Sequence, residues 1–329
     1  VAFANGIMHI IIEEGLQDLD FINSRTEGYE ELKEIVKDYT PERVAEICNI
    51  DPDDLRKAAI MYAKADKAPI MYCLGVTEHS TGTEGVMSMS NMAMLVGKLG
   101  REGCGVNPIR GQNNVQGACD MGAMPTDFPG YQKVDNPEVL AKFENAWGIK
   151  LNPKPGIKAT EVFPAAIKGD IKGLYIFGED PVVTDADTNH IIKALESLDF
   201  LVMNELFMTE TAQYADVILP GVSYAEKEGT FSNTERRVQR VRKAVELEGE
   251  MRLDTDIFID LLNRMGYPQP HLTSAEIMDE VASLTPSFAG ISHKRLDEVG
   301  SLQWPCPSKE HPGTPILHVG KFARGLGYF

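Results

Sequence analysis

The chain of 329 residues is 43% hydrophobic, which is enough to form two or three domains with buried cores. Acidic residues outnumber basic ones by 49 to 32, and the net charge of −17 argues against a nucleic-acid partner, because phosphate binding requires a basic face. The five cysteines include no C-x-x-C pair and no apolar run approaches the ~20 residues of a membrane span, so no zinc, iron–sulfur or transmembrane motif is recognisable.

The first part of the chain is predicted to be helical. Isoleucines at helical spacing indicate a helix over residues 5–15, and a second helix is expected over residues 29–39. Thr40-Pro41 and Asp51-Pro52 each place an N-cap residue before a proline, which is typical of the first turn of a helix. Two further short helices are therefore expected after these starts.

A short apolar segment, residues 69–74, predicts the first strand, since parallel strands covered on both faces are apolar throughout. The strand ends in a turn, residues 75–79, which contains Gly75 and Glu78. Ligands of open α/β sheets bind beyond the carboxyl ends of strands, so this turn is a candidate binding segment. A glycine after a strand is equally typical of an ordinary turn, and that alternative stays open.

Residues 103–125 follow a Met-rich helix predicted over residues 83–99, and nothing in their pattern suits a core helix or strand. They contain five Gly, two Pro, five side-chain amides and a single Arg, so the backbone bends often and carries many hydrogen-bonding groups. Carboxamides suit the edge of a heterocycle, and the guanidinium of Arg110 offers a planar fork for a carboxylate or phosphate. The segment predicts a cofactor and anion site, with an ordinary surface loop as the alternative.

A half-Rossmann unit is predicted in the second half of the chain. Strands over residues 173–177, 200–203 and 216–219 and a helix over residues 188–198 give a βαβαβ pattern. No G-x-G-x-x-G is present, which disfavours an ordinary NAD fold. The strands are followed by groups suited to a nucleotide: Gly178, Glu179, Asp180 and Thr184 after the first, Asn204, Glu205 and Thr209 after the second, and Pro220 after the third.

Three acids in this half are candidates for reading a guanine base. A carboxylate accepts two hydrogen bonds from the N1 and N2 edge of guanine, a chemistry that Asp180, Glu205 and the later Asp256 offer. The hydroxyls of Thr184 and Thr209 suit phosphate or ribose. Each acid by itself is also typical of a helix cap or a solvated turn.

The run from Asn107 to Ala118, NPIRGQNNVQGA, resembles the catalytic subunit of the formate dehydrogenases that bind molybdenum or tungsten, in the molybdopterin oxidoreductase superfamily. Other members of the superfamily differ in this segment, and the similarity extends over all 329 residues. The resemblance implies a metal held by two pyranopterin guanine dinucleotides, two-electron oxidation of formate to carbon dioxide, and an iron–sulfur cluster that passes electrons to an iron–sulfur or flavin subunit. Another molybdopterin oxidoreductase, such as nitrate reductase, and a non-catalytic electron-transfer scaffold stay open as alternatives.

The resemblance also implies roles for individual residues. Arg110 is expected to be catalytic, and no residue of this chain is expected to ligate the metal, because the Cys or selenocysteine ligand and the cluster lie upstream in the family. The chain would then be an internal fragment, inactive by itself and cytoplasmic, with export left open because the leader region is absent. Cofactor contacts are expected from Gly75, Glu78, Gly111, Gln112, Asn114, Gly178, Glu179, Asp180, Thr184, Asn204, Glu205, Thr209, Pro220 and Asp256.

These patterns together predict an α/β fold of half-Rossmann domains with mostly parallel sheets, similar to that of molybdopterin oxidoreductases. Residues 1–112 are expected to belong to a cofactor-binding domain that ends in the active-site loop. Residues 113–225 are expected to form a second α/β domain that binds pterin guanine dinucleotide. Residues 226–329 would continue with a basic strand, helices and a loop-rich end.

Overall fold

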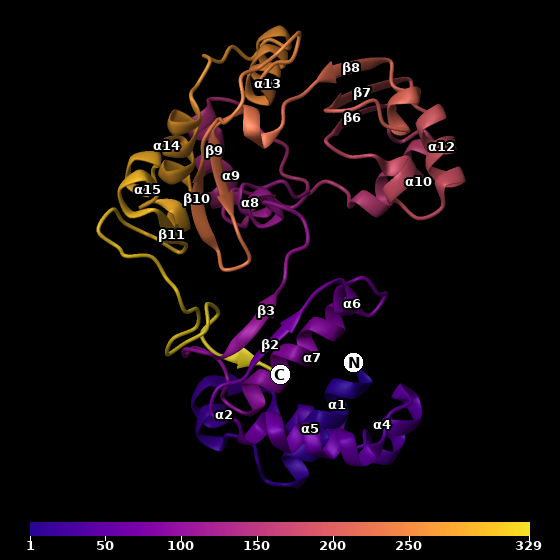
Figure 1. Cartoon of the computed structure of the whole chain (residues 1–329), viewed down its shortest axis with the longest axis vertical. Helices are drawn as coiled ribbons and strands as arrows, with labels where there is room; N and C mark the ends of the chain where they lie inside the picture. Colours follow the sequence, from indigo (N-terminus) through magenta and orange to yellow (C-terminus); the bar gives the residue numbers. More distant parts are fainter. The chain divides into compact units, whose positions relative to one another are not determined.

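The computed structural model describes all residues from 1 to 329 (Figure 1). The chain forms two compact units, one of residues 1–113 with residues 314–329 and one of residues 114–313. No helix in either unit combines the length and the apolar character that crossing a bilayer requires.

The first unit is built around helix α1, Ala2–Glu13, which is buried along most of its length. Its isoleucines share one core with residues of α4, Pro41–Cys48, and α5, Pro52–Lys64. Gly6 allows this packing, because a Cβ there would lie 2.9 Å from a methyl carbon of Val44. The other helices of this unit are α2 (Leu19–Arg25), α3 (Tyr29–Val36), α6 (Leu74–Thr77) and α7 (Gly82–Leu95).

The predicted starts of α4 and α5 are confirmed. Oγ1 of Thr40 accepts a hydrogen bond from the backbone N of Arg43 at 3.4 Å, and Oδ1 of Asp51 accepts one from the backbone N of Asp53 at 2.7 Å. Each helix begins with a proline, which has no N–H to leave unsatisfied at that position. Local capping chemistry therefore determines both boundaries.

The amide-rich segment is not free of regular structure, and that expectation is wrong. Residues Gly105–Pro108 form strand β3, which runs parallel to β2, Pro69–Tyr72, with Tyr72 opposite Pro108. Residues Val115–Asp120 form helix α8 in the second unit. Pairing with β2 stabilises a conformation that local propensity does not favour. A short parallel pair of β1 (Thr26–Glu27) and β12 (Gly327–Tyr328) joins the end of the chain to the first unit.

The second unit contains a parallel sheet of order β6-β7-β8, formed by Gly173–Phe177, Phe200–Glu205 and Val217–Pro220 (Figure 1). The predicted helix between the first two strands is present as α12, Thr188–Glu196. The second helix that a βαβαβ unit would have, between β7 and β8, is absent. The connection from β7 to β8 carries only a 3-10 helix, η1, Thr211–Tyr214, because so short a crossover leaves no room for an α-helix of ordinary length.

An antiparallel sheet of order β11-β10-β9 completes the second unit, with strands Ser301–Gln303, Arg237–Val241 and Gly229–Ser232. Val238, Phe288 and Leu302 belong to the buried core beside it. Short strands β4 (Asp127–Phe128) and β5 (Gln132–Lys133) pair with each other. The other helices are α9 (Pro137–Trp147), α10 (Ala159–Lys168), α11 (Pro181–Thr184), η2 (Tyr224–Glu226), α13 (Asp254–Arg264), α14 (Ser274–Leu284), η3 (Pro286–Phe288) and α15 (His293–Val299).

Candidate functional site

Two of the predicted binding segments lie at the same end of the β2–β3 pair. Because the strands are parallel, their carboxyl ends meet at one edge, where the N of Ile109 donates to the O of Tyr72 at 2.7 Å. Gly75 follows β2 within α6, and Arg110 follows β3 by two residues. Burial raises the pKa of the Tyr72 hydroxyl, and the nearby positive charge of Arg110 lowers it in part. The charge of Arg110 therefore acts on the hydroxyl of Tyr72, the last residue of β2.

This edge of the first unit is exposed. Gly75, Glu78, Arg110, Gly111 and Gln112 all lie at the surface. A Cβ added at Gly75 or at Gly111 would meet no atom within 4 Å, so the backbone there is open on one side. The edge is open to solvent beside Arg110, and the roles of these five residues stay predictions.

A second group of predicted residues lies at the carboxyl ends of β6, β7 and β8. Asn204 is opposite Phe177 on one side and Leu219 on the other, so it stands in the middle of the three strand ends. Its side chain is only 2% exposed, with Oδ1 accepting from the hydroxyl of Tyr175 at 3.2 Å and Nδ2 donating to the O of Leu219 at 3.2 Å. The carboxamide of Asn204 thus holds the strand ends together.

Asp180 connects the loop after β6 to the loop after β7. One of its carboxylate oxygens accepts hydrogen bonds from the N and the Oγ1 of Thr211, at 2.9 and 2.5 Å. Oγ1 of Thr211 in turn accepts from the N of Val182 at 3.0 Å. The two loops are therefore held in place by contacts of their own.

Three other predicted side chains of these loops have partners, and one has none. Thr184 donates to Glu179 at 2.7 Å, and a carboxylate oxygen of Glu205 accepts from the N of Leu206 at 2.6 Å. Oγ1 of Thr209 is buried and has no hydrogen-bond partner. A buried hydroxyl without a partner costs about 1–3 kcal/mol, which makes it a natural contact for a bound polar group.

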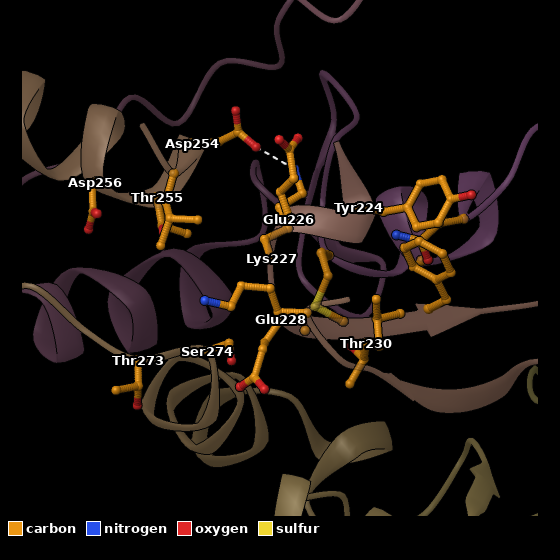
Figure 2. A pocket seen from close by; sticks show the side chains of 18 of the residues that line it. Tyr224, Glu226, Lys227, Glu228, Thr230, Asp254, Thr255, Asp256, Thr273 and Ser274 are labelled. Atoms are coloured by element: carbon orange, nitrogen blue, oxygen red, sulfur yellow. Dashed lines mark hydrogen bonds and ion pairs between the residues drawn. The ribbon is translucent and has the colours of Figure 1, made fainter. Parts of the chain in front are cut away.

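A cavity of about 920 Å³ lies in the second unit (Figure 2). Two of the predicted residues, Asn114 and Asp256, line it. Asp256 belongs to the first turn of α13 and Ser274 to that of α14, so the first turns of two helices contribute to its wall. In the 329 residues no group of three or more His, Cys, Asp or Glu side chains is arranged to hold a metal ion.

The sequence patterns do not single out Asp254 and Lys227, which also line the cavity. The side chains form an ion pair, drawn as a dashed line in Figure 2, and Asp254 is only 7% exposed. A Cβ at Gly221 would lie 3.2 Å from Oδ1 of Asp254 and 2.7 Å from Nδ2 of Asn204, so the missing side chain lets both groups approach. An acid at the start of a helix is so common that one sequence gives no signal for this further role.

The family of the chain follows from its sequence and agrees with this architecture. Residues 1–264 match the profile of the family described as "Molybdopterin oxidoreductase". The match covers most of the chain, which therefore belongs to the molybdopterin oxidoreductase family. A molybdopterin-type cofactor is the shared property of that family.

Several similar proteins are named as formate dehydrogenases or their alpha subunits, which confirms the predicted resemblance. The chain is 52% identical over 330 residues to "F420-dependent formate dehydrogenase 2 subunit alpha" of Methanococcus maripaludis, covering 99% of this chain and 48% of that protein. It is 44% identical over 334 residues to "Formate dehydrogenase H" of Escherichia coli, covering 100% of this chain and 47% of that protein. The chain spans about half the length of the curated relatives it matches.

A solved structure supports the fold. Acetylene hydratase from Pelobacter acetylenicus aligns with a TM-score of 0.71 at 21% identity, over 92% of this chain and 44% of that one. Together with the mostly parallel sheets of the two units, this likeness confirms the predicted α/β fold class of molybdopterin oxidoreductases.

Proposed function

We propose that this chain is part of the catalytic subunit of a formate dehydrogenase. The reaction converts formate to carbon dioxide and releases two electrons and one proton. The main support is the 52% identity to a formate dehydrogenase alpha subunit over 99% of the chain. A guanidinium in an open setting at the end of a parallel strand adds to it, because the substrate is a small anion.

Arg110 is the residue proposed to bind formate. Formate is planar with two equivalent oxygens, and a guanidinium pairs with both through two parallel, charge-assisted hydrogen bonds. Gly111 next to it has open space where a side chain would stand, which suits approach of a substrate to Arg110. Arg110 would hold the two carboxylate oxygens of formate. The C–H bond, which is the bond that breaks, would take no part in this contact.

The proposed cofactor is molybdenum or tungsten with two pyranopterin guanine dinucleotides. When bound, it supplies the two-electron acceptor of the reaction. Thr209 supports the fit, because its buried hydroxyl has no other partner. Asp180, Glu205 and Asp256 each offer a carboxylate to guanine. The other proposed contacts are Gly75, Glu78, Gly111, Gln112, Asn114, Gly178, Glu179, Thr184, Asn204 and Pro220.

The proposal includes a path for the two electrons. They would pass to an iron–sulfur cluster outside these 329 residues and then to an iron–sulfur or flavin subunit. We place the complete protein in the cytoplasm. The predicted division into a domain of residues 1–112, a dinucleotide-binding domain of residues 113–225 and a continuation over residues 226–329 belongs to the same proposal.

Analysis of the purified full-length protein tests this function. It should contain molybdenum or tungsten with about two guanine nucleotides per metal, one for each proposed dinucleotide. It should also oxidise formate with an artificial acceptor. Absence of both metal and nucleotide would reject the proposal, and nitrate reduction without formate oxidation would favour a nitrate reductase. Residues 1–329 alone serve as the control and should bind little metal.

A further inference from the structure

Helix α8 separates the cavity from a buried polar cluster. On the opposite side from the cavity, Gln116 and Asp120 are four residues apart and therefore share a face of the helix, at 6% and 0% exposure. Four residues of α8 and its two caps line the cavity, and they have the spacing of a single helical face: Asn114, Gly117, Ala118 and Met121.

The buried carboxylate of Asp120 is the centre of this cluster. Its Oδ1 accepts hydrogen bonds from Nε2 of Gln116 at 2.7 Å and from the hydroxyl of Tyr131 at 2.8 Å, and its Oδ2 accepts one from Nε1 of Trp304 at 2.7 Å. Arg236 lies over the Trp304 ring, 5.6 Å from its centre. Burial raises the pKa of Asp120, against the lowering effect of these hydrogen bonds. One side chain therefore joins α8 to two distant segments of the unit.

Helix α8 needs such support because it is short. It has six residues, and a helix of that length is not stable by itself. At its start, Asn114 has a φ of 60° and its Oδ1 accepts from the N of Ser232 in β9 at 2.9 Å. A Cβ at Gly117 would lie 2.1 Å from that same oxygen, so the carboxamide can fold over the helix only because Gly117 has no side chain. The position of α8 thus depends on Asn114 at its N-terminus and on Asp120 on its buried face.

We propose that Asp120 is a positioning residue for cofactor binding: it fixes the α8 wall of the cavity, and with it the carboxamide of Asn114, in the place that the pterin guanine dinucleotide requires. Asp120 does not line the cavity itself and acts through Asn114 and Gly117. Burying a carboxylate costs free energy, which an apolar side chain of the same size would not cost. A buried carboxylate with all its hydrogen bonds made fixes one arrangement of the neighbouring elements. The inference rests on the proposed function.

The test is the full-length protein with Asp120→Asn, assayed for guanine nucleotide and metal per folded protein. Asn has nearly the same size, but it removes the charge and replaces one acceptor oxygen by an NH₂ group, which leaves the indole N–H of Trp304 or Nε2 of Gln116 facing another donor. The affinity for the nucleotide should fall about three- to tenfold, as expected when roughly one hydrogen bond is lost from the bound state, and nucleotide occupancy should fall with it. Wild-type occupancy in this variant would overturn the inference.

Asp127→Asn is the matched control. Asp127 is also a buried acid of the second unit, 6% exposed, and its partners are Thr126 and Lys133. This variant should lose stability but keep its nucleotide. Equal loss of nucleotide in both variants would mean that α8 has no special role and that Asp120 is only structural.

Two further measurements keep the outcome decisive. Tyr131→Phe removes one hydrogen-bond donor to Asp120 and leaves the carboxylate charge in place. It is the variant to measure if Asp120→Asn does not fold. Unchanged nucleotide occupancy in Tyr131→Phe would then overturn the inference. The double variant of Asp120→Asn with Trp304→Phe should regain part of the nucleotide if the indole N–H is the clashing donor. A wild-type protein with neither metal nor guanine nucleotide would reject the proposed function and the inference with it, whereas wild-type loading in Asp120→Asn rejects the inference alone.

Discussion

The strand ends of the two units carry candidate residues of opposite character. At the ends of β2 and β3, Arg110 and Gln112 are exposed and Gly111 leaves open space. At the ends of β6, β7 and β8, Asn204 and Asp180 are held by hydrogen bonds within the protein. One edge offers groups that are open to solvent, and the other has loops that are already fixed.

The difference fits ligands of different size. A small anion needs a few charged contacts and an open path, which the Arg110 edge provides. A long dinucleotide contacts several loops, and its binding costs less entropy when these loops are already ordered, because preorganisation lowers the entropic cost of association. A substitution at the open edge should therefore change catalysis, and a substitution at the fixed edge should change stability and cofactor content.

The largest expected effect is that of Arg110→Lys. An ammonium is a point charge and does not reproduce the two parallel hydrogen bonds of a guanidinium with formate. In the full-length enzyme kcat/KM should fall by on the order of one to three powers of ten, about 1.4 kcal/mol for each. Formate oxidation normalised to bound metal is the measurement, since it separates loss of substrate binding from loss of cofactor.

The control for this variant is Arg101→Lys. Arg101 is an exposed arginine of the same unit, ion-paired with Asp66 at 3.2 Å, and its replacement should change kcat/KM per metal less than about twofold, as exposed pairs contribute little. Unchanged turnover and KM per metal in Arg110→Lys, with a reduced metal content, would show that Arg110 binds the cofactor and not formate.

Gly221→Ser tests the fixed edge. Its new Cβ would come within 2.7 Å of Asn204 and 3.2 Å of Asp254, so the strand end or these side chains must shift. We expect the free energy of unfolding to drop by about 1–3 kcal/mol, as for other overpacked sites, and cofactor content to drop with it. Gly173→Ser is the control, because its Cβ would make only an ordinary 3.7 Å contact with the O of Phe200. Equal stability of the two variants in urea would show that the edge is not tightly packed.

Local signals in the sequence predicted some elements well. The capped helices α4 and α5 and the apolar strands β2, β6 and β7 were predictable because capping chemistry and buried apolar runs act within a few residues. Strand β3 and helix α8 were not, because a Gly-Val-Asn-Pro sequence, in which three of the four residues favour turns, becomes a strand only through β2, and six residues become a helix only through Asp120 and Asn114. These elements depend on partners far away in the chain.

The candidate site shows the same limit. The residues after the strands could be predicted, since parallel strands bring their carboxyl ends to one edge. The internal hydrogen bonds of Asp180 and Asn204 could not, because they depend on Thr211, Tyr175 and the backbone of β8 in three dimensions. Asp254 was missed for a similar reason, since its approach to Gly221 is a property of the folded chain.

The smallest expected effect is a pH dependence of stability in the second unit. His293 is buried on α15, and its Nε2 lies 3.5 Å from a guanidinium nitrogen of Arg240. Burial and then the charge of Arg240 lower the pKa of His293, and the carboxylates of Asp297, Glu228 and Asp279 raise it in part. Because the unfolded histidine titrates near about 6.5, the stability linked to it should be fully present above that pH and be lost as the pH falls through the lower folded pKa, by at most about 1.4 kcal/mol per pH unit. Urea unfolding between about pH 7.5 and 5 measures this change. His293→Gln should flatten the profile, and a variant profile as steep as that of the wild type would assign the pH dependence to other groups.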